Sequence, residues 1–322
     1  MINDKLTVSV IIPAYNSASF IEETLDSVAS QSRLPDEVII VDDGSSDDTY
    51  QVITEWKSIH KNITIKTFQQ NNQGVSAARN LGINTASKDL IAFLDSDDLW
   101  LSDHLETLTK SFELVPDCIL AFADMTNFNR NKVVTISFLA DKPVIKLPYK
   151  SIDNFNVITD SLWNTLINGS YIPTCASMVK RNAALRIGGF DYTLKTSEDR
   201  HFFLKLSRLG KVGYFNRIIA WRRLHDENLT HDKNNVEVAK NGVLIIEKIL
   251  GEINSFSLSP EEEEATDKAL DAAILNYLYI SAHTGLLSYF RALIYVKKLS
   301  GRRYRYFSNF KLCLVAIFNS FK

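Results

Sequence analysis

Short apolar runs alternate with amphipathic stretches through the first half of the chain. The apolar runs are nearly continuous, which is typical of strands buried on both faces of a parallel sheet. The candidate strands are residues 7–14, 37–43, 63–68, 90–95 and 118–124. Helical patterns lie between them, for example at 74–86 and 102–114. This order predicts an α/β fold with an open, doubly wound, mostly parallel sheet, which would bind ligands at the carboxyl ends of its strands.

The pattern changes after residue 124. Residues 125–180 are irregular, and a helix at 197–209 and a strand at 212–221 follow. From about residue 235 the chain reads as helical almost without interruption. Helix starts are predicted from Ser19 with Glu22, from Ser102, and from Ser259 with Pro260. We therefore expect an α/β domain over 1–232 and a helical C-terminal region over 233–322.

Composition excludes several classes of protein. The 322 residues are 45% hydrophobic, too apolar for a disordered chain, and 36 basic against 38 acidic residues give no field that would attract nucleic acid. Three dispersed cysteines, Cys118, Cys175 and Cys313, suggest neither disulfides nor zinc and fit a reducing cytoplasm. The first residues do not read as a signal peptide, and no transmembrane segment is predicted.

The C-terminal residues have an uneven charge. No Asp or Glu follows Asp271, whereas residues 272–322 carry eight basic side chains interleaved with aromatic ones. The basic residues are Arg291, Lys297, Lys298, Arg302, Arg303, Arg305, Lys311 and Lys322. This pattern favours peripheral contact with an anionic membrane. The alternatives are RNA binding, or aromatic residues that pack on the α/β domain or on a second copy of the chain.

Carboxylates gather where two predicted strands end, Asp42 and Asp43 after one and Asp95, Asp97 and Asp98 after the other. Because crowded like charges are unfavourable, we expect a cation there. Mg²⁺ or Mn²⁺ is usually held by one or two carboxylates plus substrate phosphates, so the cluster indicates a metal-bound nucleotide.

The roles of these acids can be divided. Alternation along an extended segment would put Asp95 and Asp97 on one side and Asp98 on the other, which favours Asp95 facing the nucleoside and Asp97 the metal. Two alternatives stay open. Asp97 or Asp98 would cap the next helix, and Asp42 and Asp43 would serve only the turn in DDGSSDDT.

Four motifs in order resemble a known family. They are VSVIIPAYNSASFIEETLDSVASQS, EVIIVDDGSSDDT, NQGVSAARNLGI and IAFLDSDDLW. The chain looks like the family 2 glycosyltransferases over about its first 230 residues. The resemblance implies a GT-A fold, with a nucleotide-sugar-binding half over about 1–124 and an acceptor-side half over about 125–232. It also implies transfer from a nucleotide-diphosphate sugar, usually a UDP-sugar, with inversion and with Mn²⁺ or Mg²⁺ as cofactor.

The resemblance assigns donor residues by position. Pro13 and Tyr15 would lie beside the base and Asp43 would bond its edge, while Asp95 would approach the ribose and Asp97 would hold the metal.

Two further positions join the donor side. Arg79 follows the start of a predicted helix, whose N-terminus favours anions, although a surface arginine is the alternative. His225 matches a histidine near the diphosphate or metal, but Trp221, Arg222 and Arg223 are offset from the family pattern, and a bland loop histidine is the alternative.

On the acceptor side the resemblance matches Glu198 and Asp199 to the family's acidic pair, with Asp199 as the base that deprotonates the acceptor hydroxyl. The alternative is a helix cap, made by Thr196 with Asp199. Gly189 and Asp191 match the loop that shapes the acceptor pocket.

The expected function is synthesis of a bacterial-type surface polysaccharide or lipid-linked glycan on the cytoplasmic side, at the inner face of the plasma membrane. An oligomer is compatible with the sequence. A nucleotidyltransferase of similar fold would carry a Gly-rich, basic loop after its first strand, where this chain has PAYNSASF. A non-catalytic nucleotide-sugar-binding protein is the other alternative, against which the presence of both Asp97 and Asp199 weighs.

Overall fold

The structure is a computed structural model that describes residues 5–129, 132–225, 235–252 and 256–299, together with 315, 317 and 319. The described residues form two compact units. One comprises those of Met1–Thr193 and Glu198–His225, and the other those of Leu194–Ser197 and Asp226–Lys322. The boundary predicted near residue 232 falls outside the described residues and stays a prediction.

The first unit is built on one sheet with the order β3-β2-β1-β4-β10-β6-β11-β9-β8, in which β5 also pairs with β11 and β7 with β6. The strands are β1 (Val8–Ala14), β2 (Glu37–Asp42), β3 (Ile65–Gln69), β4 (Leu90–Phe93), β5 (Leu99–Trp100), β6 (Cys118–Asn129), β7 (Lys132–Thr135), β8 (Tyr149–Ile152), β9 (Phe155–Ile158), β10 (Ser177–Lys180) and β11 (Lys211–Arg223). The strands β1 to β4 are mutually parallel, with Val10 of β1 opposite Val38 of β2 and Ala92 of β4. The predicted fold class is confirmed.

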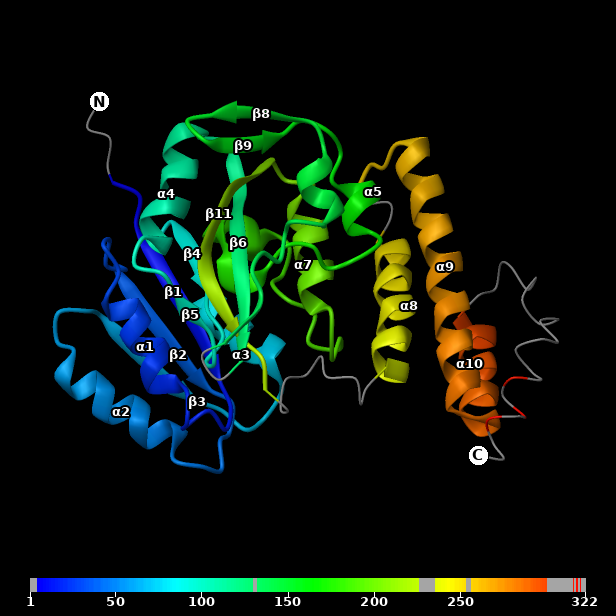
Figure 1. The fold of residues 1–322 in the computed structure, drawn as a ribbon, viewed down its shortest axis with the longest axis horizontal. Coiled ribbons are helices and arrows are strands. Elements are labelled where there is room, and N and C mark those ends of the chain that lie inside the picture. The colour runs from blue at the N-terminus through cyan, green and yellow to red at the C-terminus, as the bar shows by residue number, and fades with distance from the viewer. Residues whose placement is uncertain are drawn as a thin grey trace. The chain divides into compact units, whose positions relative to one another are not determined.

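Helices cover both faces of this sheet (Figure 1). They are α1 (Ile21–Ala29), α2 (Thr49–Ile59), α3 (Val75–Thr85), α4 (His104–Leu114), α5 (Trp163–Leu166), α6 (Arg181–Arg186) and α7 (Glu198–Leu206), with 3₁₀ turns η1 (Pro143–Lys146) and η2 (Thr174–Ala176). On one face, Leu25, Trp56 and Leu105 of α1, α2 and α4 join a buried cluster with Val10. The sheet is therefore doubly wound.

Helices α3 and α7 pack on the other face, as strand alternation requires. Gly82 of α3 approaches β1 so closely that a Cβ atom there would lie 2.4 Å from Ile11 Cγ2. Phe202 of α7 meets Phe93 of β4 edge to face at 5.8 Å between ring centroids. Such a pair contributes about 0.5–1.5 kcal/mol beyond burial. These contacts fix the two helices that carry Arg79 and Asp199.

The region expected to be irregular supplies one strand, β10, to the middle of the sheet and a hairpin, β8–β9, to its edge. Strand β10 lies antiparallel between β4 and β6, so β4 does not pair with the strand predicted at 118–124. Strands β8 and β9 form a hairpin whose turn, Asp153 and Asn154, has positive φ angles of 48° and 66°.

Two of the three predicted helix starts are wrong. Helix α1 begins after Phe20 and α4 after Asp103, neither with a side-chain cap. Near α1, Asp47 and Thr49 accept bonds from the amides of Ala18 and Ser17, so the turn after β2 replaces a local cap.

The second unit consists of α8 (Asn235–Gly251), α9 (Pro260–Thr284) and α10 (Leu286–Leu299). Within it the three helices share an apolar cluster that includes Val243, Leu278 and Ala292. The predicted cap at Ser259 is confirmed, since its side chain accepts from Glu262 N while Glu262 bonds back. Among the described residues, no helix has the length and apolar character needed to cross a bilayer.

Candidate active site

The predicted donor residues lie at the carboxyl edge of the parallel strands. Pro13 is buried in β1 opposite Val41, and Tyr15 follows that strand with a side chain that is 51% exposed. Asp43 comes directly after β2, and its amide donates to Ala14 O at 2.8 Å. The ends of β1 and β2 are thus joined where the resemblance places the base.

Asp43 organises the loop before α3. Its carboxylate accepts from Gln70 Nε2 at 2.7 Å, from Gln73 N at 2.9 Å and from Gly74 N at 2.7 Å. Asp42 is used in the turn after β2, where Ser45 N donates to its carboxylate at 3.1 Å. The turn interpretation of Asp42 is therefore supported, while Asp43 reaches across to a separate loop.

The Asp95 to Asp98 segment is a turn and not an extended strand. Strand β4 ends at Phe93, and Asp98 N donates to Asp95 O at 3.1 Å. The predicted alternation of these acids along an extended segment is wrong, because the turn sets the directions of their side chains. The side chains of Asp95 and Asp97 are 34% and 21% exposed, whereas Asp98 is buried.

Asp97 is paired with His225. Its Oδ2 atom lies 2.8 Å from His225 Nε2, and the imidazole packs against Phe20 with 5.0 Å between ring centroids. The structure therefore brings together the residue assigned to the metal and the histidine assigned near it, from positions 128 apart in the chain.

The same pair has the chemistry of a partial metal site. Adjacent ligands of an octahedral ion with bonds of about 2.1 Å are roughly 3 Å apart, so one carboxylate oxygen and one imidazole nitrogen at this spacing fit a single ion. In the described part of the chain, no group of three or more His, Cys, Asp or Glu side chains could hold a metal. Two protein ligands suit an ion that is completed by substrate phosphates and water.

Arg223 packs behind the acid turn. Its Nε atom donates to Asp97 O and its amide to Asp98 Oδ1, both at 2.9 Å, while its guanidinium lies over the rings of Phe20 and Phe128. Burial raises the pKa of Asp98 well above its usual range, and Asp97 and Asp95 raise it further. Asp98 thus supports the turn, and Arg223 is the arginine that holds it.

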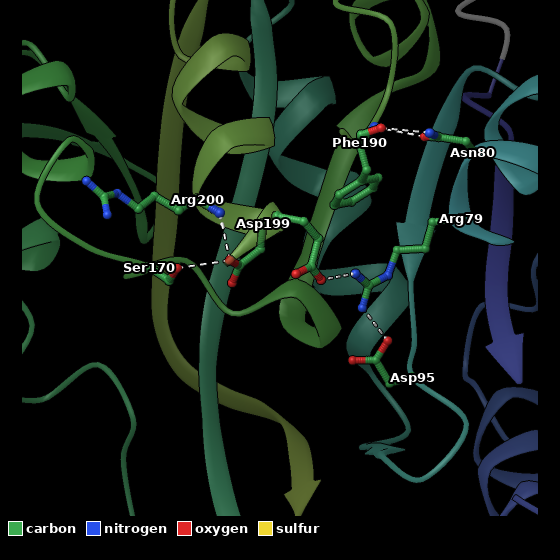
Figure 2. Close-up of polar contacts among 8 residues, drawn as sticks. Arg79, Asn80, Asp95, Ser170, Phe190, Asp199 and Arg200 are labelled. Carbon is green, nitrogen blue, oxygen red and sulfur yellow. Dashed lines mark hydrogen bonds and ion pairs between the residues drawn. The ribbon is translucent and has the colours of Figure 1, made fainter. Parts of the chain in front are cut away.

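Arg79 connects an acid predicted for the donor side, Asp95, to one predicted for the acceptor side, Glu198 (Figure 2). The residue is buried in α3, and its Nη2 donates to Asp95 Oδ1 at 2.6 Å while Nη1 donates to Glu198 Oε1 at 2.8 Å. Burial alone would lower the pKa of this guanidinium, but Asp95 and Glu198 raise it, so it stays charged. The surface alternative for Arg79 is wrong.

Neighbouring Asn80 holds the loop that is predicted to shape the acceptor pocket. Its side-chain amide donates to Phe190 O at 2.7 Å and accepts from Phe190 N at 2.8 Å, as Figure 2 shows. Gly188 and Gly189 precede this clamp with φ angles of 81° and 71°. Asp191 then closes a local turn by accepting from Thr193 N at 2.9 Å.

Asp199 lies at the start of α7. Its Oδ1 atom accepts from Ser170 Oγ at 2.9 Å and from Arg200 N at 2.7 Å (Figure 2). Burial raises the pKa of this carboxyl above its usual range, more than Ser170 and the Arg200 amide lower it. Thr196, the cap alternative, instead accepts from Asn241 Nδ2 at 2.9 Å. Asp199 is therefore a carboxylate whose raised pKa suits a general base.

Sequence reasoning missed Ser170 and Asn80, and it named Arg223 only as offset from the family pattern, without a role. Asn80 follows Arg79 in the ARN motif and Arg223 precedes His225 by two positions, so proximity to assigned residues was an available signal. Ser170 lies in an irregular segment with no such signal.

Comparison with known proteins decides the family. The model for the glycosyl transferase family 2 matches residues 9–180. The chain belongs to this family. The putative teichuronic acid biosynthesis glycosyltransferase TuaG of Bacillus subtilis is 40% identical to this family 2 chain over 234 residues, 72% of this chain and 85% of that protein.

Chondroitin synthase of Pasteurella multocida is 29% identical over 81% of this chain and 25% of that protein. Hyaluronan synthase of the same organism is 30% identical over 77% of this chain and 24% of that protein. This chain therefore spans about a quarter of the length of these two synthases.

Solved structures agree on the fold. S. aureus TarS in complex with UDP-GlcNAc superposes with a TM-score of 0.66 at 20% identity, over 92% of this chain and 82% of that chain. The mannosyltransferase PcManGT from Pyrobaculum calidifontis, in complex with GDP-Man and Mn²⁺, gives a TM-score of 0.58 at 19% identity, over 99% of this chain and 88% of that chain. At these identities the likeness shows the fold alone, which is the GT-A fold.

Proposed function

We propose that the chain is an inverting, metal-dependent glycosyltransferase that transfers a sugar from a nucleotide-diphosphate donor, a UDP-sugar, to a hydroxyl of a glycan or lipid-linked acceptor. The observation that carries the proposal is the buried Arg79, which bonds the donor-side Asp95 and the acceptor-side Glu198 next to Asp199. The similarity to TuaG, a putative teichuronic acid biosynthesis glycosyltransferase, supports a role in cell-surface polysaccharide synthesis, which we place at the cytoplasmic side of the membrane.

The donor end of the proposal rests on Tyr15, Pro13, Asp43 and Asp95. The exposed ring of Tyr15 offers a stacking surface for a base at the edge where β1 and β2 end. Asp95 keeps one carboxylate oxygen on Arg79, which leaves its other oxygen for a ribose hydroxyl. TarS was solved with UDP-GlcNAc, which supports a uridine nucleotide here.

The metal would be held by Asp97 and His225, whose ligand atoms are 2.8 Å apart. When bound, Mn²⁺ or Mg²⁺ supplies Lewis-acid stabilisation of the negative charge on the departing nucleoside diphosphate. Arg223 holds the main chain of the same turn at Asp97 O, which keeps the carboxylate directed toward the imidazole.

At the acceptor end, Asp199 takes the proton of the acceptor hydroxyl. The hydroxyl oxygen forms a bond to the anomeric carbon, and the bond from that carbon to the diphosphate oxygen breaks with its electron pair on the leaving group. Because attack occurs opposite the leaving group, the configuration inverts. Ser170 and the Arg200 amide direct the carboxylate, and the clamped loop of Gly189 and Asp191 borders the acceptor.

The test is a panel of nucleotide sugars added to purified full chain with Mn²⁺, first read by thermal stabilisation and then by product analysis with a glycan acceptor. We expect one UDP-sugar to stabilise the protein and the product to have the inverted anomeric configuration by NMR. Release of pyrophosphate would indicate a nucleotidyltransferase. Donor binding without hydrolysis or transfer would indicate a non-catalytic binding protein, and a retained configuration would contradict the direct displacement.

A further inference from the structure

Helix α10 has two apolar faces. Tyr289, Ala292 and Val296 form one face and are at most 5% exposed, because they pack within the second unit. Leu287, Phe290 and Ile294 are 66%, 48% and 57% exposed. At about 3.6 residues per turn these three side chains form a stripe on the opposite side of the helix. Single exposed apolar residues are ordinary, but a continuous stripe marks an interaction surface.

Basic side chains flank this stripe. Arg291, Lys297 and Lys298 are exposed, and the helical period places them beside the stripe, Lys297 at its Phe290 edge and Arg291 and Lys298 at the other edge. Helix α10 contains no acidic residue, and Asp271 is the last acid of the sequence. A further five basic residues follow α10 in the sequence, at 302, 303, 305, 311 and 322. The stripe therefore combines apolar surface with positive charge.

We propose that the face of α10 formed by Leu287, Phe290 and Ile294 docks on an anionic lipid surface. The apolar side chains would enter the boundary between headgroups and acyl chains while Arg291, Lys297 and Lys298 contact lipid phosphates. Charge favours an anionic lipid surface over a second copy of the chain. A second copy that met this stripe with the same face would place like cations against one another. The inference does not depend on the proposed transfer reaction, because lipid binding is measured without it.

The experiment is co-sedimentation of the full chain with vesicles, either pure phosphatidylcholine or phosphatidylcholine with phosphatidylglycerol as the anionic lipid. We expect binding at least roughly tenfold tighter to the anionic vesicles, falling steeply as added salt shortens the screening length. A variant with Leu287→Gln, Phe290→Gln and Ile294→Gln should lose most of this binding. A variant with Arg291→Gln, Lys297→Gln and Lys298→Gln should lose the preference for anionic lipid.

The matched control changes another exposed apolar set, Val133→Gln, Val134→Gln and Ile136→Gln, which are 52%, 57% and 73% exposed in the first unit. This control should bind vesicles as the wild type does. Circular dichroism and thermal unfolding verify that each variant is folded.

Equal binding to neutral and anionic vesicles, or unchanged binding by the folded α10 variant, would overturn the proposal. A dimer that forms with rising concentration, that is lost in the α10 variant and that shows no vesicle binding would assign the stripe to contact between copies instead.

Discussion

Arg79 and Glu198 are 119 positions apart in the chain, yet Arg79 Nη1 donates to Glu198 Oε1 at 2.8 Å. The other terminal nitrogen of the same guanidinium binds Asp95. A single buried cation thus neutralises one acid assigned to the donor and one that adjoins the proposed base. Burial raises the pKa of Glu198, Arg79 lowers it and Asp199 raises it again. Arg79 therefore links Glu198 of α7 electrostatically to Asp95, the acid assigned to the donor.

Arg79→Met should lower both stability and transfer. Breaking a buried ion pair from one side leaves uncompensated charge and costs about 3–5 kcal/mol of unfolding free energy. Urea unfolding and transfer kinetics measure the two effects. The double variant Arg79→Met with Glu198→Gln should be more stable than Arg79→Met alone, because one orphaned carboxylate is removed. Wild-type stability in Arg79→Met would contradict the link.

Transfer should depend on pH through Asp199. A base acts only when it is ionised, and the pKa of Asp199 is raised. The plot of kcat/KM against pH should therefore have an acidic limb, in which kcat/KM falls as pH decreases, at a pH above the usual carboxyl range. Asp199→Asn should lose about 10²–10⁴-fold in rate.

Ser170→Ala removes a hydrogen bond that favours the charged carboxylate, so the acidic limb should move to higher pH while transfer persists. Asp141→Asn, at a side chain that is 80% exposed, is the matched control. If the pH profile of Ser170→Ala were the same as that of the wild type, Ser170 would not influence the ionisation of the base.

Metal and donor should stabilise the protein together. In wild-type chain, UDP with Mn²⁺ at about 100 times Kd adds roughly 2.7 kcal/mol to stability, and EDTA should remove the gain. Asp97→Asn should abolish this shift and His225→Ala should reduce it, whereas His283→Ala, at an exposed histidine of α9, should leave it unchanged. Full stabilisation of Asp97→Asn by Mn²⁺ and UDP would reassign the ligand.

Glu37 should make the stability of the protein depend on pH in the acidic range. Burial would raise the pKa of this buried carboxyl, but Lys66, Ser9 and Ser87 together lower it to about 2. Its stabilising contribution is therefore present above the unfolded value, about 4.3, and is lost as pH falls toward 2. Glu37→Gln should destabilise by about 1.5–3 kcal/mol at neutral pH. In urea unfolding, the difference in unfolding free energy between Glu37→Gln and wild type should shrink below pH 4. A difference that stays constant with pH would show that the charge of Glu37 is not the cause of the destabilisation.

A methyl group at Gly189 should disturb the acceptor loop. A Cβ atom there would lie 2.2 Å from Asn80 Oδ1, and the φ angle of +71° is strained for any other residue. Gly189→Ala should therefore destabilise by about 1–3 kcal/mol and reduce transfer. Gly242→Ala is the control, because nothing lies within 4 Å of its added Cβ in α8. That change should be neutral or stabilising by up to about 1 kcal/mol in thermal unfolding.

The parallel strands were predictable because β1, β2 and β4 are buried on both faces and so read as continuous apolar runs. Strand β10 was not, since its four residues, SMVK, are too few to show a period. The β8–β9 hairpin carried an unused signal, because Asp-Asn between alternating residues suits a two-residue turn with positive φ.

The candidate site also has a part that was predictable from the sequence and a part that was not. Motif order located Asp95, Asp97 and Asp199, and also Arg79, Glu198 and His225, but not which of these side chains bond one another. The bonds from Arg79 to Glu198 and from His225 to Asp97 span 119 and 128 positions. A single sequence does not indicate which side chains this far apart are in contact, because their contact depends on how α3, α7 and β11 pack.

The place of β10 has a consequence for how the chain is made. Strands β4 and β6 are synthesised well before residues 177–180, yet each of them pairs with β10. On the ribosome both strands therefore remain with an open, hydrogen-bonding edge until about the last residue of β10 has emerged. Unpaired apolar edges of this kind are where nascent chains associate wrongly. Residues 1–124 alone therefore leave the sheet incomplete, because the edge of β4 is covered only when residues 177–180 of β10 pair with it.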